Sequence, residues 1–494
     1  MSTDQSPGIS AGPPSGSGAS GALSDFALDS TKRDFATVMS EFRIKAKSGD
    51  LGSLPAVLAI IVLVAVFGLS RGDSFLTALN FANFLEQSSA VIVIAMAVTF
   101  VLLLGEIDLA AGYTAGVSAA VLALRLEASW SLAWAILLSA LVAIALGLWT
   151  GTLVAKLGIP SFVVTLANFL IFQGILQILV KEGGSVRIDN KVVTGIVGDQ
   201  LSPGFSWAFG LVALALYGYS QFARWRRSDG GTPLSLLIAK LVVASVLVVA
   251  LIIVLNQNRA FENAKAEIRG MPYVIPLVLV IMLVLTLILN RTRYGRHLLA
   301  VGGNQEAARR AGISVVRVRL SAFAVCGLLA GVGGSFLASR VNSIDPNTGG
   351  NDTLLLAVGA AVVGGTSLFG GKGRMVNAVL GGLVLALIPN GLGLVGKAVP
   401  FGTVWPFIVG IASISGLYIA GQLRKRESSA SVTTSVLATR LAVAGVVTVG
   451  LSAVLIGNRE TEIDFSSSGV KFICSGLALL LAASVDALTR KRSA

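Results

Sequence analysis

Apolar segments of about 20 residues follow one another from residue 54 to residue 488, separated by short polar loops. A segment of that length can cross a bilayer, where its backbone groups are satisfied only within a helix or a closed barrel. The chain is 54% hydrophobic and 13% charged, which is too apolar for a soluble protein of 494 residues. We therefore predict an all-α fold, a polytopic transmembrane helical bundle. About 14 segments are predicted spans: residues 54–70, 87–104, 109–124, 130–155, 161–180, 205–222, 234–255, 273–289, 320–338, a shorter one at 354–363, 376–395, 404–420, 441–456 and 470–488.

Basic residues lie in the loops between these spans and predict the orientation of the chain. The loops at residues 224–227, 290–320 and 424–426 and the C-terminus are basic, whereas the alternate loops have mixed or acidic charge. The positive-inside rule therefore places both termini in the cytoplasm. The net charge of +13 indicates contact with anionic membrane lipid and not with nucleic acid, because the basic residues follow the topology instead of lining one soluble face.

Few side chains could hold a metal or carry covalent chemistry. Cys326 and Cys474 lie in apolar segments, so we expect small buried side chains and no disulfide, and His297 is the only histidine. The sequence has no G-x-x-x-x-G-K-[ST] loop, so ATP hydrolysis is not expected to be its own activity. We expect no cofactor, no metal site and no enzymatic activity.

Composition divides the chain into three regions. Residues 1–50 are predicted to be a disordered cytoplasmic tail, whose later part is either an amphipathic helix on the inner leaflet or a plain linker. Residues 51–423 hold the main transmembrane domain, which includes a pair of spans near 205–255. Residues 424–494 form a C-terminal extension with two further predicted spans.

A long basic loop at residues 290–320 joins two predicted spans and contains a helix signal. Asn304 can cap a helix over residues 305–311, which have high helix propensity, and Gly312 stands where such a helix would end. A short exposed helix at this position offers a soluble partner a rigid handle on both spans. The alternative is an ordinary cytoplasmic loop whose arginines only fix the orientation.

Two short glycine-rich motifs interrupt the apolar segments, GEIDLAAG at residues 105–112 and GGTSLFGGKG at residues 364–373. Their shared glycines and leucine predict duplicated halves with broken helices. A simple count of spans puts both motifs on the same side, as in a parallel repeat, whereas a re-entrant segment counted as a span would reverse that. Irregular backbone at membrane depth lines a cavity or is buried in protein. The candidate path residues in these motifs are Glu106, Asp108, Gly112, Thr366 and Ser367.

Two acids in the first motif and two amides in a separate apolar span are further candidates for a translocation path. Glu106 and Asp108 are ionisable, and such groups cost about 2.5–3.5 kcal/mol to insert at membrane depth. They either serve the path or lie at the water interface, where Asp108 would cap the following helix. Asn168 and Gln173 interrupt the apolar span at 161–180, and their alternative role is hydrogen bonding between helices.

Three strings of the sequence resemble the membrane permease of bacterial ABC sugar importers of the ribose and xylose class. They are GGNQEAARRAGISV, LSAFAVCGLLAGVGG and VVGGTSLFGGKGR, and the resemblance covers about residues 80–423. The string GEIDLAAG matches the glycine, isoleucine, aspartate and leucine pattern of the family. The string GIPSFVVTL, the extra pair of spans near 205–255 and the acidic Glu106 resemble the xylose branch more than the ribose branch. Ala110 and Ala111 depart from the serine and valine usual in the family, and the last two spans have no counterpart in its pattern.

The resemblance implies a permease subunit of an ATP-driven importer of a pentose, with xylose as the first candidate, in the bacterial cell membrane. It implies three partners: a second permease copy, a separate ABC ATPase and an extracellular sugar-binding protein. In that family the basic loop holds a cytoplasmic coupling helix that docks on the ATPase. The matching residues here are Asn304, Glu306, Ala307, Ala308 and Gly312.

Several alternatives remain open at this point. Glu306 either contacts the ATPase or only neutralises Arg309 or Arg310 by local pairing. The chain could be a permease of the same family for another monosaccharide, such as ribose or galactose. It could also be an ion-coupled secondary transporter with Glu106 and Asp108 as its relay, or a passive membrane scaffold. The EAARRAG string favours the importer, because a secondary transporter has no need of it.

Overall fold

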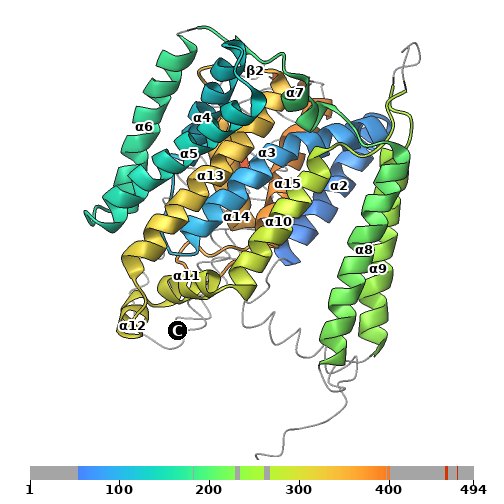
Figure 1. Cartoon of the computed structure of the whole chain (residues 1–494). Coiled ribbons are helices and arrows are strands. Elements are labelled where there is room, and N and C mark those ends of the chain that lie inside the picture. Colours follow the sequence, from blue (N-terminus) through green and yellow to red (C-terminus); the bar gives the residue numbers. More distant parts are fainter. Residues whose placement is uncertain are drawn as a thin grey trace, which may run out of the picture. The chain divides into compact units, whose positions relative to one another are not determined.

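The computed structural model describes residues 54–181, 183–227, 234–260, 267–395, 398–400, 462–464 and 475–476. Nearly all of its regular structure is helical, as predicted (Figure 1). The elements in order are α2 (Leu54–Phe75), α3 (Ala78–Leu102), α4 (Ala111–Glu127), α5 (Leu132–Ala155), α6 (Ser161–Val180), β1 (Val186–Arg187), α7 (Lys191–Gly198), α8 (Pro203–Arg226), α9 (Leu234–Leu255), α10 (Val274–Arg291), α11 (Arg293–Gly303), α12 (Gln305–Arg310), α13 (Val315–Val341), β2 (Ser343–Ile344), α14 (Asn351–Val363), α15 (Met375–Val395), β3 (Ala398–Pro400) and β4 (Glu462–Asp464).

The predicted spans between residues 54 and 395 each correspond to one helix of the structure. Within the described residues, eight helices are long and apolar enough to cross a membrane: α2, α3, α5, α6, α9, α10, α13 and α15. The other three helices that correspond to predicted spans, α4, α8 and α14, are shorter or less apolar. The predicted spans at 404–420 and 441–456 and the tail at 1–50 lie outside the described residues. So does most of the C-terminal extension, including all of the predicted span at 470–488 except residues 475–476.

The chain divides into two compact units. The smaller unit comprises Met1–Lys47 and Gly210–Ala250, and in its described part α8 and α9 form a helical pair. A side chain at Gly218 would lie in ordinary contact with Leu241 of the other helix. The larger unit comprises Ser48–Phe209 and Leu251–Ala494, and it contains all the other elements. This larger unit holds both glycine-rich motifs and the basic loop.

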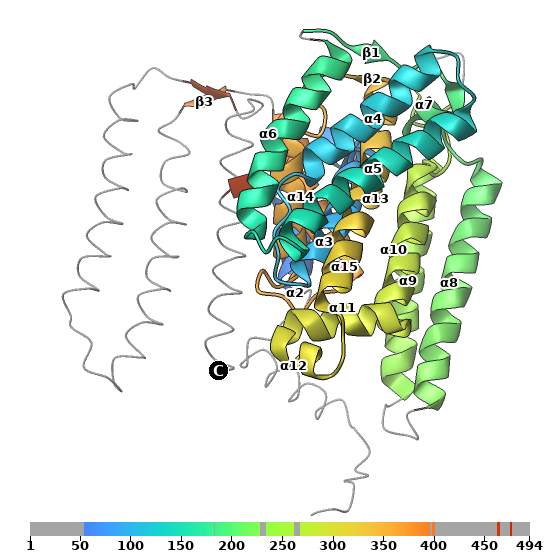
Figure 2. The same cartoon turned by 60° about the vertical axis from the view of Figure 1, so that its left-hand side comes forward.

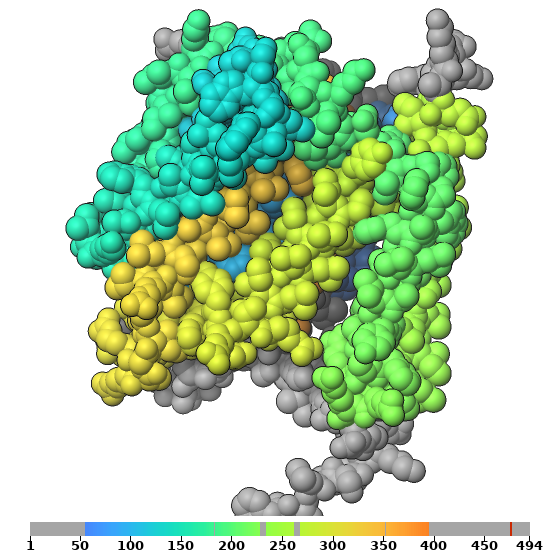
Figure 3. Space-filling model, viewed as in Figure 1, coloured from blue at the N-terminus to red at the C-terminus, as the bar shows by residue number. Residues whose placement is uncertain are grey.

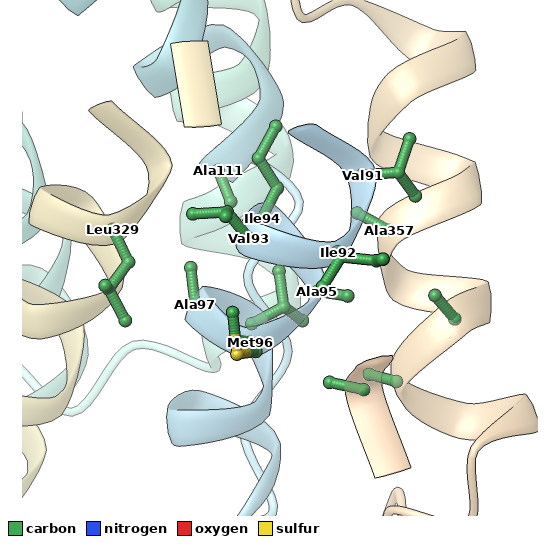
Figure 4. Close-up of a cluster of buried hydrophobic side chains, with 14 of the residues drawn as sticks. Val91, Ile92, Val93, Ile94, Ala95, Met96, Ala97, Ala111, Leu329 and Ala357 are labelled. Carbon is green, nitrogen blue, oxygen red and sulfur yellow. The ribbon is translucent and has the colours of Figure 1, made fainter. Parts of the chain in front are cut away.

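The helix α3 lies at the centre of the larger unit, because 83% of the residues in its most apolar stretch are buried. Figure 4 shows its side chains between Leu329 of α13 and Ala357 of α14. The long helix α13 packs against α3, α4 and α5. By contrast, α2 and α5 leave many large apolar side chains exposed, as expected for helices that face lipid.

Small residues allow α13 to approach its neighbours closely. A Cβ at Gly331 would lie 2.7 Å from the Ser118 hydroxyl oxygen, and one at Gly334 would overlap the Ala115 carbonyl oxygen. Ser118 and Ser139 also exchange hydrogen bonds between α4 and α5, with 2.8 Å between their hydroxyl oxygens. Small residues and hydroxyls at helix contacts are the usual means by which helices associate in a membrane.

Short strands join two of the loops that the charge pattern places on the non-cytoplasmic side. β1 pairs antiparallel with β2, with Val186 opposite Ile344. The short helix α7, which the sequence did not predict, is held nearby because Ser339 Oγ accepts from Val197 N (2.9 Å) and donates to the Thr194 carbonyl (3.1 Å). In two views β1, β2 and α7 lie at one end of the larger unit, and α11 and α12 lie at the other (Figures 1 and 2). A second antiparallel pair joins β3 to β4.

Candidate functional site

The basic loop folds into two helices, α11 and α12, which we call the coupling segment after the role that the resemblance implies. The sequence predicted only the second, so the picture of a long loop with a single helix is wrong. Thr292 caps α11 by accepting from Gly295 N at 3.2 Å, and Gly295 allows the sharp turn because a Cβ there would overlap the Leu289 carbonyl. α11 buries Gly295, Leu298 and Val301 on one face. It lies across the end of the bundle (Figure 1), and both helices are on the molecular surface (Figure 3).

The start and stop predicted for α12 are confirmed. Asn304 Oδ1 accepts from Ala307 N at 2.9 Å, which caps the helix. The helix ends at Arg310, and Gly312 has a φ of +80°, the left-handed conformation common just after a helix. Ala308 is 4% exposed and anchors α12 to the bundle. α12 is therefore a short, well-terminated helix with one buried face.

Glu306 pairs locally and stays accessible. Its Oε1 lies 2.9 Å from Arg309 Nη1, and both side chains are about two-thirds exposed, at 63% for Glu306 and 60% for Arg309. This is the local pairing that the sequence left open. An exposed pair of this kind contributes little to stability. A contact between Glu306 and an ATPase is compatible with this exposure and stays a prediction.

Arg319 links the coupling segment to the first glycine-rich motif. The prediction that the loop continues to residue 320 is wrong, because α13 begins at Val315 and carries Arg319 on its second turn. Arg319 Nη2 lies 2.7 Å from Glu106 Oε1 and 3.1 Å from Gln305 Oε1 of α12. We call these three side chains the Arg319 clasp. The Arg319 and Glu106 side chains are only 22% and 13% exposed, so water screens their attraction less than at an open surface.

The two glycine-rich motifs meet each other and the end of α11 through their backbones. Gly371 N donates at 2.9 Å to the carbonyl of Leu103, just before the first motif, and a Cβ at Gly370 would lie 2.8 Å from Gly105 N. A Cβ at Gly302 would overlap that same carbonyl oxygen and would lie 2.9 Å from Gly371 N. Both motifs therefore lie at the same end of the bundle, in agreement with the count of spans, although the proposed duplication remains a prediction.

The first motif is also fixed by side chains from α6 and α13. Ile107 N donates to Ser161 Oγ at 3.3 Å, and Thr165 Oγ1 donates to the Ile107 carbonyl at 3.2 Å. Asp108 Oδ1 accepts from Ala110 N at 2.9 Å, and its Oδ2 accepts from the Cys326 thiol at 3.4 Å. Asp108 thus bonds the turn before α4, which is close to the capping role considered from the sequence.

Most of the predicted path residues are packed inside this chain. Asn168 donates to Thr150 Oγ1 at 2.9 Å and accepts from Trp149 Nε1 at 3.2 Å, so it joins α5 to α6. Ser367 Oγ accepts from Phe369 N, which shapes the second motif. The predicted path residues that are at most 4% exposed are Asp108, Asn168, Thr366 and Ser367. Gln173, in contrast, lines a polar cavity.

The sequence analysis did not identify two residues of this region, Tyr294 in the coupling segment and Arg319 in the clasp. Tyr294 lies where α11 packs on the bundle, and burial there raises the pKa of its hydroxyl. Arg319 was interpreted only as a topology charge. An acid at a helix break, Glu106, and a basic segment after α10 could have indicated an ion pair between them. No local sequence pattern, however, connects Glu106 with Arg319, because the two residues are far apart in the chain.

Comparison with known proteins shows that the chain belongs to a family of membrane permeases. Residues 80–414 match the family described as branched-chain amino acid transport system / permease component. The chain is 33% identical over 368 residues to the xylose transport system permease protein XylH of Escherichia coli K12, covering 74% of this chain and 90% of that protein. The XylH protein of Haemophilus influenzae is 34% identical over 372 residues, covering 74% and 94%.

The similarity extends to ribose permeases. The ribose import permease protein RbsC of Escherichia coli K12 is 30% identical over 345 residues, which cover 69% of this chain and 86% of that protein. No solved structure matches the chain. The matched region contains both glycine-rich motifs and the coupling segment.

Proposed function

Because the chain belongs to the family of branched-chain amino acid transport system permease components, we propose that it forms the membrane path of an ATP-driven importer of a pentose. Xylose is the first candidate, since relatives at 33% and 34% identity are xylose permeases, and ribose is the next, from a relative at 30%. The chain is a multi-pass membrane protein, and its relatives are transport permeases and not enzymes.

The partners follow from this assignment. A separate ABC ATPase would bind the coupling segment, and an extracellular sugar-binding protein would deliver the sugar at the opposite end. A second permease copy would complete the path, and membrane lipid would cover the apolar faces of helices such as α2 and α5. The coupling segment and both termini would then lie in the cytoplasm, as the basic loops indicate.

Residues 51–423 are proposed as the permease domain, because the family match covers residues 80–414 of it. Residues 1–50 would be an N-terminal tail, and residues 424–494 a C-terminal extension that carries two further spans. These additions flank the part that matches the relatives. They are not needed for the coupling geometry, all of which lies between residues 103 and 373.

The Arg319 clasp is the observation that carries the mechanism. Closure of the ATPase would move α12, and Arg319 would pass that displacement to Glu106 of the first motif. The backbone contacts of Gly302 with Leu103, just before the first motif, and with Gly371 of the second motif provide a second, stiffer link. Since Ser161 and Cys326 bond the first motif to α6 and α13, these helices would move with it and alternate the access of a central path.

The same contacts argue against an ion relay. Glu106 is held in an ion pair with Arg319, and Asp108 is bonded to a backbone N–H and a thiol. A proton or sodium relay needs carboxylates that exchange their ion with a water-filled path. The acids of the first motif are instead engaged in holding its structure.

The test is sugar-stimulated ATP hydrolysis in proteoliposomes that contain this chain, its cognate ATPase and its sugar-binding protein. Xylose-loaded binding protein should stimulate hydrolysis by the wild type, and Glu306→Arg should reduce that stimulation about tenfold, because it places the wrong charge on the docking face. Arg309→Ala breaks the same exposed pair from the other side and should keep the stimulation. Sugar uptake on an ion gradient without the ATPase would overturn the importer assignment.

A further inference from the structure

A polar cavity of about 460 Å³ opens in the larger unit, at the end opposite the coupling segment. Elements far apart in the sequence line it: α4, α6, the end of α13, the loop after β2, and the start of α14. The lining side chains that carry the argument are Tyr113, Gln173, Asp345, Asn347, Thr348 and Asp352. Its volume falls in the range of about 300–1,000 Å³ that is usual for small-molecule sites.

The loop at residues 345–350 lines the cavity and is seated directly on α4. A Cβ at Gly112 would lie 3.0 Å from Leu354 Cβ and would overlap the Gly349 carbonyl oxygen, and one at Gly116 would overlap the Thr348 carbonyl. The loop also bonds itself, because Asp345 Oδ1 accepts from Asn347 N at 2.7 Å and Thr348 Oγ1 accepts from Asp345 N at 3.0 Å. The cavity wall is therefore preformed.

The lining chemistry selects a class of ligand. Among the residues that the structure describes, the lining combines hydroxyl, amide and carboxylate groups with Leu337 and Val341 as its large aliphatic side chains, and it includes no lysine or arginine. Two carboxylates without a cation disfavour phosphorylated and acidic compounds. A branched apolar ligand would leave most of these polar groups without a partner in the ligand. A neutral polyhydroxylated ligand can both donate to the carboxylates and accept from the amides.

We propose that this cavity is the first sugar site of the permease, where a monosaccharide released by the binding protein is held before translocation; this rests on the proposed function. Its position agrees, because Gly112, the last residue of the first motif, lies directly against Gly349 of the cavity wall. Motion of the Arg319 clasp would thus reach the site through the first turn of α4. Gly112, predicted from the sequence as a path residue, acts here as the seat of the loop.

The site can be tested by thiol protection on the full-length chain. Asn347→Cys, in a Cys474→Ser background, places an accessible thiol on the cavity wall, while the native Cys326 is buried. A membrane-impermeant maleimide should label it, and xylose at about ten times its dissociation constant should slow labelling about tenfold. Asp189→Cys lies on an exposed loop, with 78% of the native side chain accessible, and should be labelled at a rate that xylose does not change. Leucine and sodium chloride, at the same concentrations, test the other ligand classes.

A second variant guards against damage caused by the cysteine itself. Gln173→Leu removes two donors and one acceptor from the lining and should raise the KM for uptake about fivefold or more while the maximal rate is kept. Protection of Asn347→Cys by xylose, with the KM effect, supports the site. Protection by leucine or sodium instead of xylose overturns the ligand class.

The outcomes separate this proposal from the proposed function. If xylose stimulates ATP hydrolysis in the wild type, yet neither protects Asn347→Cys nor shows a KM change in Gln173→Leu, the cavity is not the sugar site and the importer assignment stands. If xylose protects but ATP hydrolysis is never stimulated, the site stands and the ATP-driven function fails. If xylose neither protects Asn347→Cys nor stimulates ATP hydrolysis, the sugar site and the ATP-driven function both fail.

Discussion

The two glycine-rich motifs lie side by side, yet they are held in different ways. The first motif is bound by side chains: Glu106 pairs with Arg319, Asp108 with Cys326, and Ile107 with Ser161 and Thr165. The second motif is held largely by its own backbone and by close approach. Gly371 N donates to the Leu103 carbonyl, and Ser367 N donates to the Lys372 carbonyl at 2.9 Å.

This difference separates two tasks that a broken segment must perform. A side-chain ion pair can break and reform as its partner moves, so the first motif is suited to follow the coupling segment. Where backbones touch directly through glycine, no side chain can change its rotamer to absorb a displacement. The second motif is therefore suited to act as a fixed wall. The three comparisons below test this division in order of their expected effect on the free energy of unfolding.

The largest effect is expected at the junction of both motifs. Gly302→Ala should lower the free energy of unfolding by about 3 kcal/mol, because its Cβ would overlap the Leu103 carbonyl and press on Gly371 N. Gly303→Ala adds the same methyl group one residue later, where nothing lies within 4 Å, and should be close to neutral. Thermal unfolding in detergent and ATP-driven uptake measure both. Equal behaviour of the two variants would contradict the close contact.

A smaller effect is expected from the Arg319 clasp. Glu106→Gln or Arg319→Ala should cost about 2 kcal/mol, between the values for exposed and fully buried pairs, and should uncouple ATP hydrolysis from uptake. The exchange Glu106→Arg with Arg319→Glu should restore part of the coupling. Arg317→Ala removes an exposed arginine from the same helix and serves as the control. If it uncouples as strongly as Arg319→Ala, general loss of positive charge is the cause and the clasp is not.

The smallest effect compares one threonine from each side of the junction. Thr165→Val removes the bond to the Ile107 carbonyl of the first motif and should cost about 1 kcal/mol. Thr366 of the second motif is 1% exposed, and within the described part of the chain its Oγ1 has no hydrogen-bond partner. Thr366→Val should therefore be neutral or stabilise by about 1 kcal/mol. Differential melting temperatures decide, and a large loss in Thr366→Val would show a polar role for that hydroxyl.

Local signals in the sequence predicted much of the fold. Each predicted span between residues 54 and 395 became a helix, because an apolar run of about 20 residues has few other solutions in a membrane. The ends of α12 were predicted because Asn304 and Gly312 act on their own helix, within a few residues. α11 was missed because its buried face has only three small or aliphatic positions among arginines.

The candidate site was predicted less completely. The motifs, the coupling helix and Glu306 were found as separate features, but Arg319 was not assigned to Glu106. Asn168 proved to be a bond between helices, which is the alternative that the sequence had left open. The cavity around Asn347 was not foreseen, since its walls come from four helices and one loop.

The sequence by itself determined what each segment is: an apolar span, a basic loop, a capped helix or a glycine-rich break. These properties depend on residues within one or two helical turns. Only the tertiary structure decided which segments meet, because the contacts of Gly302, Arg319 and Gly112 join residues far apart in the chain. Such contacts depend on the close approach of whole helices, which no short pattern encodes. The coupling route through Arg319 and the proposed sugar cavity both depend on such long-range contacts.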